Sequence, residues 1–98
     1  MRLVRADTDP KRIDEAITAY EDVTLTWLAE AEGFCAALLF VDRRSGRSIS
    51  ETVWYDHGAL AASRSAAAAI RRDTVAATDS AIRAIEEYRL IFHSAEPT

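Results

Sequence analysis

The sequence contains no asparagine and no glutamine, and it has only one cysteine, two prolines and three glycines. The single cysteine, Cys35, excludes a disulfide framework within the chain and a zinc cluster built from cysteines. The scarcity of proline and glycine excludes collagen-like and proline-rich linker sequences. Because the side-chain amides are missing, any mechanism that depends on one is excluded as well.

Excess basic charge and long apolar runs are also lacking. The 12 basic residues are outnumbered by 16 acidic ones, which gives a net charge of −4, so no nucleic-acid partner is expected. The longest apolar run, residues 34–41, is far shorter than a membrane span, so no membrane association is expected. The N-terminus has no apolar signal segment, which predicts a cytoplasmic protein. The two histidines are far apart in sequence, so no metal site is expected.

The composition that remains is typical of one globular domain. Hydrophobic residues make up 49% of the 98 residues and charged residues 29%. We expect a single domain over residues 1–94 and a C-terminal tail over residues 95–98.

The first half of the chain predicts a strand, a long helix and a hairpin. Residues 3–6 form a short strand. Asp9 and Pro10 mark a helix start, and apolar residues then recur at helical spacing, so one helix is expected over about residues 10–32, ended by Gly33. Residues 34–41 and 48–55 are predicted strands, joined by a turn with Gly46 in a left-handed conformation.

The second half predicts one more helix and one more strand. A helix is expected over about residues 59–75, a loop over residues 76–80 and a last strand over residues 82–92. The order is therefore β-α-β-β-α-β. This order predicts an α+β fold of the ferredoxin-like type, with a four-stranded antiparallel sheet and both helices on one face.

The predicted strand over residues 34–41 is apolar on both faces. We expect Phe34, Ala36, Leu38 and Phe40 to point one way and the alternate residues to point the other way. Two helices cover only one face of a sheet, so a large apolar patch would stay exposed in a monomer. The sequence therefore predicts a homodimer that forms through the open sheet face.

Several short motifs occur in a characteristic order along nearly the whole chain. A Gly-Phe pair precedes the apolar strand, Asp-Arg follows that strand, a Ser-Gly-Arg turn leads to a strand that ends in Trp, and a Glu-x-Tyr strand closes the chain. They are Gly33-Phe34, Asp42-Arg43, Ser45-Gly46-Arg47, Thr52-Val53-Trp54, Ala59-Leu60 and Glu87-Tyr88-Arg89-Leu90. In this pattern the chain resembles the antibiotic biosynthesis monooxygenase-like family.

The resemblance implies a dimeric α+β barrel that binds a small molecule. The family includes cofactor-independent oxygenases of polycyclic phenols or quinols and haem-degrading enzymes. The haem-degrading members have an Asn near the end of the first strand and a Trp and a His on the second helix, whereas this chain has Asp7 there and neither residue on its predicted second helix. A cofactor-independent oxygenase of an aromatic or quinol substrate, with no cofactor, is therefore the implied function. A non-catalytic dimeric module for ligand binding or assembly is the alternative.

The densest cluster of polar and aromatic residues is Trp54-Tyr55-Asp56-His57. In the functional interpretation Trp54 and Tyr55 position an aromatic ring, and His57 accepts a phenolic proton. In the structural interpretation Trp54 closes one end of the core and Asp56 caps the following helix.

Glu51 is a second candidate base. It lies between Ile49 and Val53 on one face of its strand, where an isolated carboxylate could accept a proton. Arg5 and Arg89, on the neighbouring strands, are predicted substrate-binding residues in the lining of the barrel. The alternative is an ion pair of Glu51 with Arg5 or Arg89 that serves structure alone.

Overall fold

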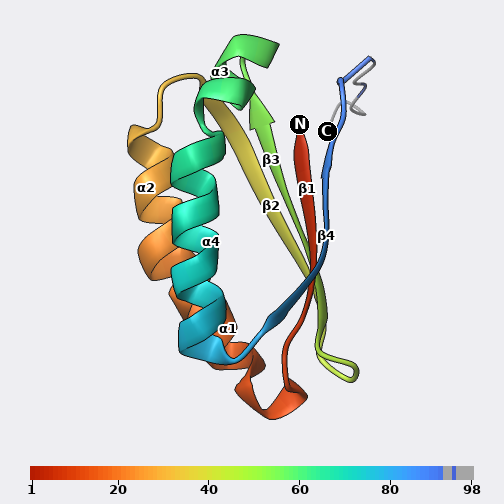
Figure 1. The fold of residues 1–98 in the computed structure, drawn as a ribbon. Helices are drawn as coiled ribbons and strands as arrows, with labels where there is room; N and C mark the ends of the chain where they lie inside the picture. The colour runs from red at the N-terminus through yellow and green to blue at the C-terminus, as the bar shows by residue number, and fades with distance from the viewer. Residues whose placement is uncertain (92–93, 95–98) are drawn as a thin grey trace.

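The computed structural model describes residues 1–91 and Ser94. Its sheet has the strand order β2-β3-β1-β4, and neighbouring strands are antiparallel. The strands are β1 (Arg2–Asp7), β2 (Phe34–Asp42), β3 (Arg47–Trp54) and β4 (Ala81–Glu87). All helices lie on one side of the sheet, and the other side is uncovered (Figure 1). The predicted α+β fold of the ferredoxin-like type is confirmed.

The first helical segment is divided by a π-helical turn. It consists of η1 (Pro10–Arg12), α1 (Ile13–Ala19), the π-helix η2 (Tyr20–Thr24) and α2 (Leu25–Glu30). The prediction of one regular helix over residues 10–32 is therefore wrong in detail, although the backbone stays helical to Glu30. The π-turn coincides with β-branched residues, which fit poorly in an α-helix. The Thr26 hydroxyl also donates to the Asp22 carbonyl at 2.8 Å.

The second helical segment begins earlier and ends later than predicted. It consists of α3 (His57–Ala62) and α4 (Arg64–Thr78), so the expected loop over residues 76–80 is largely helical. Asp56 caps α3 as expected, because its Oδ1 accepts from the Ala59 N–H at 2.8 Å. Asp79, with a φ of 52°, ends α4 in the left-handed conformation.

The hairpin between β2 and β3 depends on Gly46. Its φ of 77° confirms the predicted left-handed conformation. A Cβ at this position would lie 1.8 Å from the Thr8 carbonyl oxygen. The Thr8 N–H donates to the Gly46 carbonyl at 2.9 Å, so the hairpin tip is tied to the end of β1.

Two strand predictions need correction. The last strand, expected over residues 82–92, ends at Glu87, and Phe92 and residues 95–98 lie outside the described residues. A register shift between Phe34 and Ala36 moves Phe34 away from the face shared by Leu38 and Phe40. Phe34 packs instead against Trp54 on the helix side, with ring centroids 5.9 Å apart.

The core lies at the end of the molecule where α2 and α3 cover β2 and β3. It is centred on Leu28, Trp54 and Leu60, with Trp27 and Phe34 packed against it. Leu28 is the one large side chain that is fully buried among the described residues. The rest of the layer between the sheet and the helices is less tightly filled, and this is where a cavity lies.

Candidate functional site

A cavity of about 150 Å³ lies between the sheet and the helices. Its walls are mostly apolar, but hydroxyl groups, two guanidinium groups and two aromatic rings also face it. The polar and aromatic lining residues are Arg2, Thr8, Tyr20, Thr24, Trp27, Ser48, Ser50, Thr52, Arg71, Thr74, Thr78 and Ser80.

Small side chains leave this space open. On β3 the residues that face the helices are Ser48, Ser50 and Thr52, and on the opposite wall lie Ala16 and Ala67. An empty cavity of this size costs about 3–4 kcal/mol of stability in a protein core. Walls that carry hydroxyl groups can instead hold water or a polar ligand.

Tyr20 enters the cavity at the start of the π-turn. Its hydroxyl oxygen is buried and has no hydrogen-bond partner among the described residues. Burial raises the pKa of Tyr20 above its ordinary value, so the hydroxyl stays protonated and can donate. π-turns occur often at functional sites, and here both ends of the turn, Tyr20 and Thr24, line the cavity.

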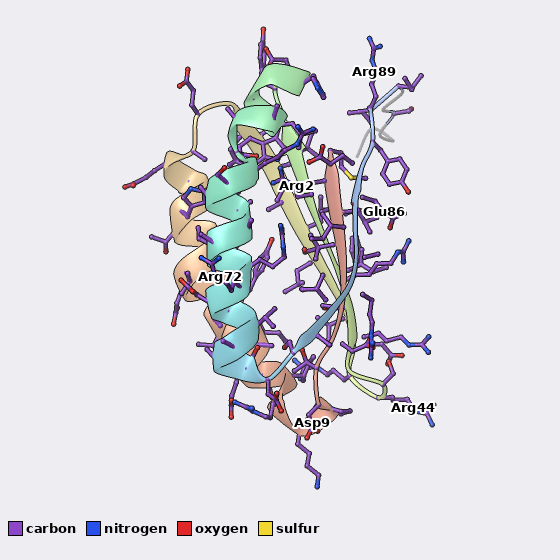
Figure 2. The ribbon with its side chains drawn as sticks, in the orientation of Figure 1. Arg2, Asp9, Arg44, Arg72, Glu86 and Arg89 are labelled. Atoms are coloured by element: carbon purple, nitrogen blue, oxygen red, sulfur yellow. The ribbon has the colours of Figure 1, made fainter. Side chains whose placement is uncertain are left out.

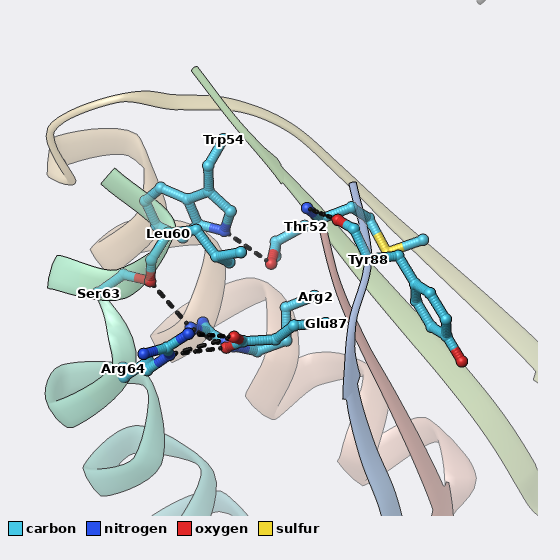
Figure 3. Close-up of polar contacts among 9 residues, drawn as sticks. Arg2, Thr52, Trp54, Leu60, Ser63, Arg64, Glu87 and Tyr88 are labelled. Atoms are coloured by element: carbon cyan, nitrogen blue, oxygen red, sulfur yellow. Dashed lines mark hydrogen bonds and ion pairs between the residues drawn. The ribbon is translucent and has the colours of Figure 1, made fainter. Parts of the chain in front are cut away.

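Arg2 brings a positive charge to the wall formed by the sheet. It is buried, and its Nη2 lies 3.1 Å from Ser63 Oγ, 3.2 Å from the Leu60 carbonyl and 3.3 Å from Glu87 Oε2. Arg64 Nε also donates to Glu87, at 3.1 Å to each carboxylate oxygen. Figure 3 shows the two guanidinium groups meeting at one carboxylate. The pair of cations lowers the pKa of Glu87, through the hydrogen bonds from Arg64 first and the charge and hydrogen bond of Arg2 after it.

Arg71 brings a second positive charge, from α4. It is partly buried beside the cavity and forms no ion pair within the part of the chain that the structure describes. Its pKa is lowered, chiefly by burial and further by the charge of Arg2. Unlike Arg2, Arg71 therefore forms no ion pair with a carboxylate of residues 1–91.

One end of the cavity is closed by linked hydroxyl groups. Thr8 Oγ1 and Thr78 Oγ1 lie 2.6 Å and 2.8 Å from Ser80 Oγ, and Thr78 also donates to the Thr74 carbonyl. These hydroxyls satisfy one another, so this end of the cavity is structural. Other polar groups that line the cavity, among them those of Tyr20, Ser50 and Arg71, are left available to a ligand.

The predicted site residues do not line this cavity. Trp54, Tyr55, His57 and Arg89 border a separate depression on the surface, together with Tyr88 and Leu90 at the end of the described chain. Trp54 itself is buried in the core, and its indole N–H donates to Thr52 Oγ1 at 3.0 Å (Figure 3). Tyr55 is 81% exposed. The structure therefore brings these four residues together, and their predicted catalytic and binding roles stay predictions.

Glu51 and Arg5 lie on the open face of the sheet. Glu51 is paired in register with Leu3 and Leu38. Arg5 Nε lies 3.1 Å from Glu86 Oε2, so the partner of Arg5 is Glu86 and the expected pair with Glu51 is absent from the described ion pairs. Figure 2 places Arg2 between the two layers and Glu86 on the open side. The roles predicted for Glu51 and Arg5 stay predictions as well.

Sequence reasoning missed Tyr20 and Arg71 as site residues. Tyr20 lies within the predicted helix over residues 10–32, where its spacing from the apolar residues indicates only a core position. Arg71 stands beside Arg72 on the predicted helix, where charged residues usually face solvent, yet it follows Ala67 by four residues and precedes Val75 by four. Residues at that spacing share one helix face, and this signal could have indicated Arg71.

Metal ligands do not cluster in residues 1–91. No three side chains from His, Cys, Asp and Glu lie close enough there to share an ion. No helix in the same residues has both the length and the apolar character to cross a membrane. The predicted absence of a cofactor and the predicted cytoplasmic location stay predictions.

Comparison with known proteins yields structural neighbours. No family model matches the sequence, and no curated protein matches it. The monooxygenase from the gene ActVA-Orf6 of Streptomyces coelicolor, solved with nanaomycin D, has a TM-score of 0.68 at 14% identity and covers 96% of this chain and 90% of its own. SnoaB, a cofactor-independent oxygenase from Streptomyces nogalater, has a TM-score of 0.62 at 19% identity and covers 95% of each chain. A structure from Deinococcus radiodurans that is described as an antibiotic biosynthesis monooxygenase has a TM-score of 0.67 at 11% identity and covers 98% of this chain and 100% of its own. This chain has the antibiotic biosynthesis monooxygenase fold.

The fold is the part that this likeness establishes. Proteins with the same fold can catalyse different reactions. Sequence identities of 14% and 19% do not establish that this chain shares the reaction of these neighbours. In a chain with the antibiotic biosynthesis monooxygenase fold, the side chains of the cavity and of the sheet surfaces determine the function.

Proposed function

We propose that this protein is a homodimeric, cofactor-independent oxygenase that binds a small aromatic phenol or quinol in the cavity between its sheet and its helices. The observation that carries the proposal is the buried Tyr20 hydroxyl, which faces the cavity and finds no hydrogen-bond partner in the described part of the chain. A buried polar group without a partner costs free energy, and a ligand oxygen that accepts its hydrogen bond removes that cost. The structural neighbours supply the reaction class, since they include monooxygenases, one of them described as cofactor-independent.

The cavity suits an aromatic ligand that carries oxygen. The indole of Trp27 and the ring of Tyr20 offer flat apolar surfaces, while Ser50 and Arg71 offer hydrogen-bond donors at the edge of the space. Apolar walls with a few placed polar groups are typical of small-molecule sites.

The proposed reaction needs no electrons from the protein. In an anthrone-type substrate, a ring CH2 becomes C=O, one O2 is consumed and one water is released. The substrate carbon supplies all four electrons. A hydroquinone that is only oxidised to a quinone would instead give two electrons to O2 and release hydrogen peroxide.

The open face of the sheet supports the dimer. Leu38 and Phe40 are 42% and 51% exposed there, which is high for such large apolar side chains in a strand. The same face also carries charges of both signs, including Arg5, Glu51 and Glu86. A second copy of this chain could therefore match both its apolar area and its charges. Sedimentation at micromolar concentration should give about twice the 10.8 kDa chain mass, and a stable monomer would contradict the dimer.

The test of the oxygenase is oxygen uptake with anthrone-type phenols and hydroquinones. With an anthrone-type phenol we expect one O2 per substrate molecule and no oxygen returned when catalase is added. Oxidation of a hydroquinone to its quinone would instead leave peroxide, from which catalase returns oxygen. Tyr20→Phe should lower kcat/KM about tenfold or more, because it removes the proposed hydrogen bond to the substrate.

Three further variants locate the site. Tyr55→Phe, His57→Gln and Glu51→Gln test the roles predicted from the sequence. A loss of activity in these variants, with Tyr20→Phe fully active, would move the site to the surface depression or the open face. Ligand binding without oxygen uptake would support the alternative of a non-catalytic binding module.

A further inference from the structure

The charges around the cavity are positive, although the chain as a whole carries −4. Arg2 and Arg71 line the cavity, and no carboxylate does so among the described residues. Arg2 forms an ion pair with Glu87, which also pairs with Arg64. Three guanidinium groups are thus set against one carboxylate.

Arg71 carries the charge that is left uncompensated. An unpaired charge that is partly removed from water is unfavourable unless a counter-charge is supplied. The depressed pKa of Arg71, caused by burial and then by Arg2, has the same origin. Because the described protein residues offer Arg71 no anion, a ligand is the natural source of one.

Tyr20 supplies a neutral donor to the same space. Its hydroxyl is buried, has no hydrogen-bond partner within residues 1–91, and reaches the cavity from the helical segment opposite the sheet. A guanidinium and a phenolic hydroxyl are both donors, and together they match an oxygen that carries negative charge. A neutral ether or a neutral carbonyl would interact more weakly with the Arg71 guanidinium than an ionised oxygen does.

We propose that the cavity binds its aromatic ligand as an anion, with the ionised ring oxygen held by Arg71 and the Tyr20 hydroxyl. This inference rests on the proposed function, since it concerns the same cavity, and it adds the ionisation state of the ligand. Arg71 is then a specificity-determining residue that selects acidic phenols. The proton of the phenol leaves to solvent before or during binding, so this step needs no protein base in the cavity.

The experiment compares 4-nitrophenol, whose anion is yellow, with 4-nitroanisole, which cannot ionise. We expect 4-nitrophenol to bind about tenfold more tightly at neutral pH by calorimetry. The absorbance titration of the bound phenol should shift to lower pH by about one unit, which is the same tenfold factor. Equal affinity for the two compounds, or a shift to higher pH, would overturn the inference and leave the aromatic cavity intact. No binding of either compound would overturn the proposed function together with it.

Variants on α4 test whether Arg71 causes the preference for 4-nitrophenol and the shift of its titration. Arg71→Leu should abolish both the preference and the shift, whereas Arg71→Lys should keep much of each because it retains the charge. Arg72→Leu, at the exposed neighbouring position, is the matched control and should behave as the unmodified protein. Thermal melting of each variant shows whether it is folded, and an unchanged preference in folded Arg71→Leu would overturn the assignment to Arg71.

Discussion

One strand of the sheet, β3, presents its two faces in the opposite sense to most strands of one-sided antiparallel sheets. Such sheets usually place apolar residues toward the helices and polar residues toward water. Here β3 turns Ser48, Ser50 and Thr52 toward the helices, and its alternate positions, Ile49 and Val53, lie on the open face. At β3 the covered face therefore has a cavity in place of apolar packing, while the open face gains apolar area that no helix covers.

This inversion connects the two proposals. A covered face with hydroxyl-bearing small residues is suited to hold a ligand. An open face with Leu38 and Phe40 is suited to contact another protein surface. A substitution on one face that has the effect expected for the other face would contradict this division of roles.

The largest expected difference concerns packing. Leu28→Ala, which truncates the fully buried leucine of the core, should lower the free energy of unfolding by about 2–5 kcal/mol. Leu38→Ala, on the open face, should cost much less in a dilute monomer and become costly only at concentrations where the dimer forms. Chemical denaturation at two protein concentrations measures both effects. Equal losses at every concentration would mean that the open face is already buried within the monomer.

A smaller difference concerns one carboxylate on each face. Glu87→Gln leaves the buried Arg2 with a neutral partner and should lower stability by about 1–3 kcal/mol. Glu86→Gln, which removes the exposed partner of Arg5, should change stability little.

The stability that Glu87 contributes should depend on pH in a defined direction. The pKa of Glu87 is lowered in the folded state, so its contribution is present above its unfolded pKa of about 4.3 and is lost as the pH falls through the lower folded value. Acid titration of Glu87→Gln should therefore show a weaker loss of stability below about pH 4. An acid profile identical to that of the unmodified protein would contradict the role of Glu87.

The order of the strands and helices could be predicted from the sequence because periodicity and turn residues are local signals. Gly46, Gly33 and the Asp56 cap are examples, since each acts within a few residues of the chain. The open apolar face could also be predicted from the sequence, because apolar residues occupy both faces of the strand over residues 34–41.

The location of the cavity could not be predicted in the same way. It depends on which small residues from β1, β3, α1 and α4 meet across the layer, and no local pattern records that meeting. Residues 54–57 were predicted as a site because polar and aromatic residues are adjacent there in the sequence. In the structure Trp54 packs in the core, and its neighbours face the surface. The π-turn at Tyr20 was missed because helical spacing alone does not distinguish it from an α-helix.

The smallest expected effect is also the one that separates function from stability on the covered face. Tyr20→Phe removes a buried hydroxyl that has no partner among the described residues, so it should leave the protein as stable or more stable by up to about 1 kcal/mol. Tyr88→Phe, which removes an exposed hydroxyl bonded to Glu86, is the control and should leave ligand binding unchanged. If Tyr20→Phe instead destabilises the protein and ligand affinity is unchanged, the hydroxyl has a structural partner and the covered face is ordinary core. A gain in stability together with weaker binding would show that this part of the covered face is maintained for the ligand, because a residue kept for folding alone would not lower stability.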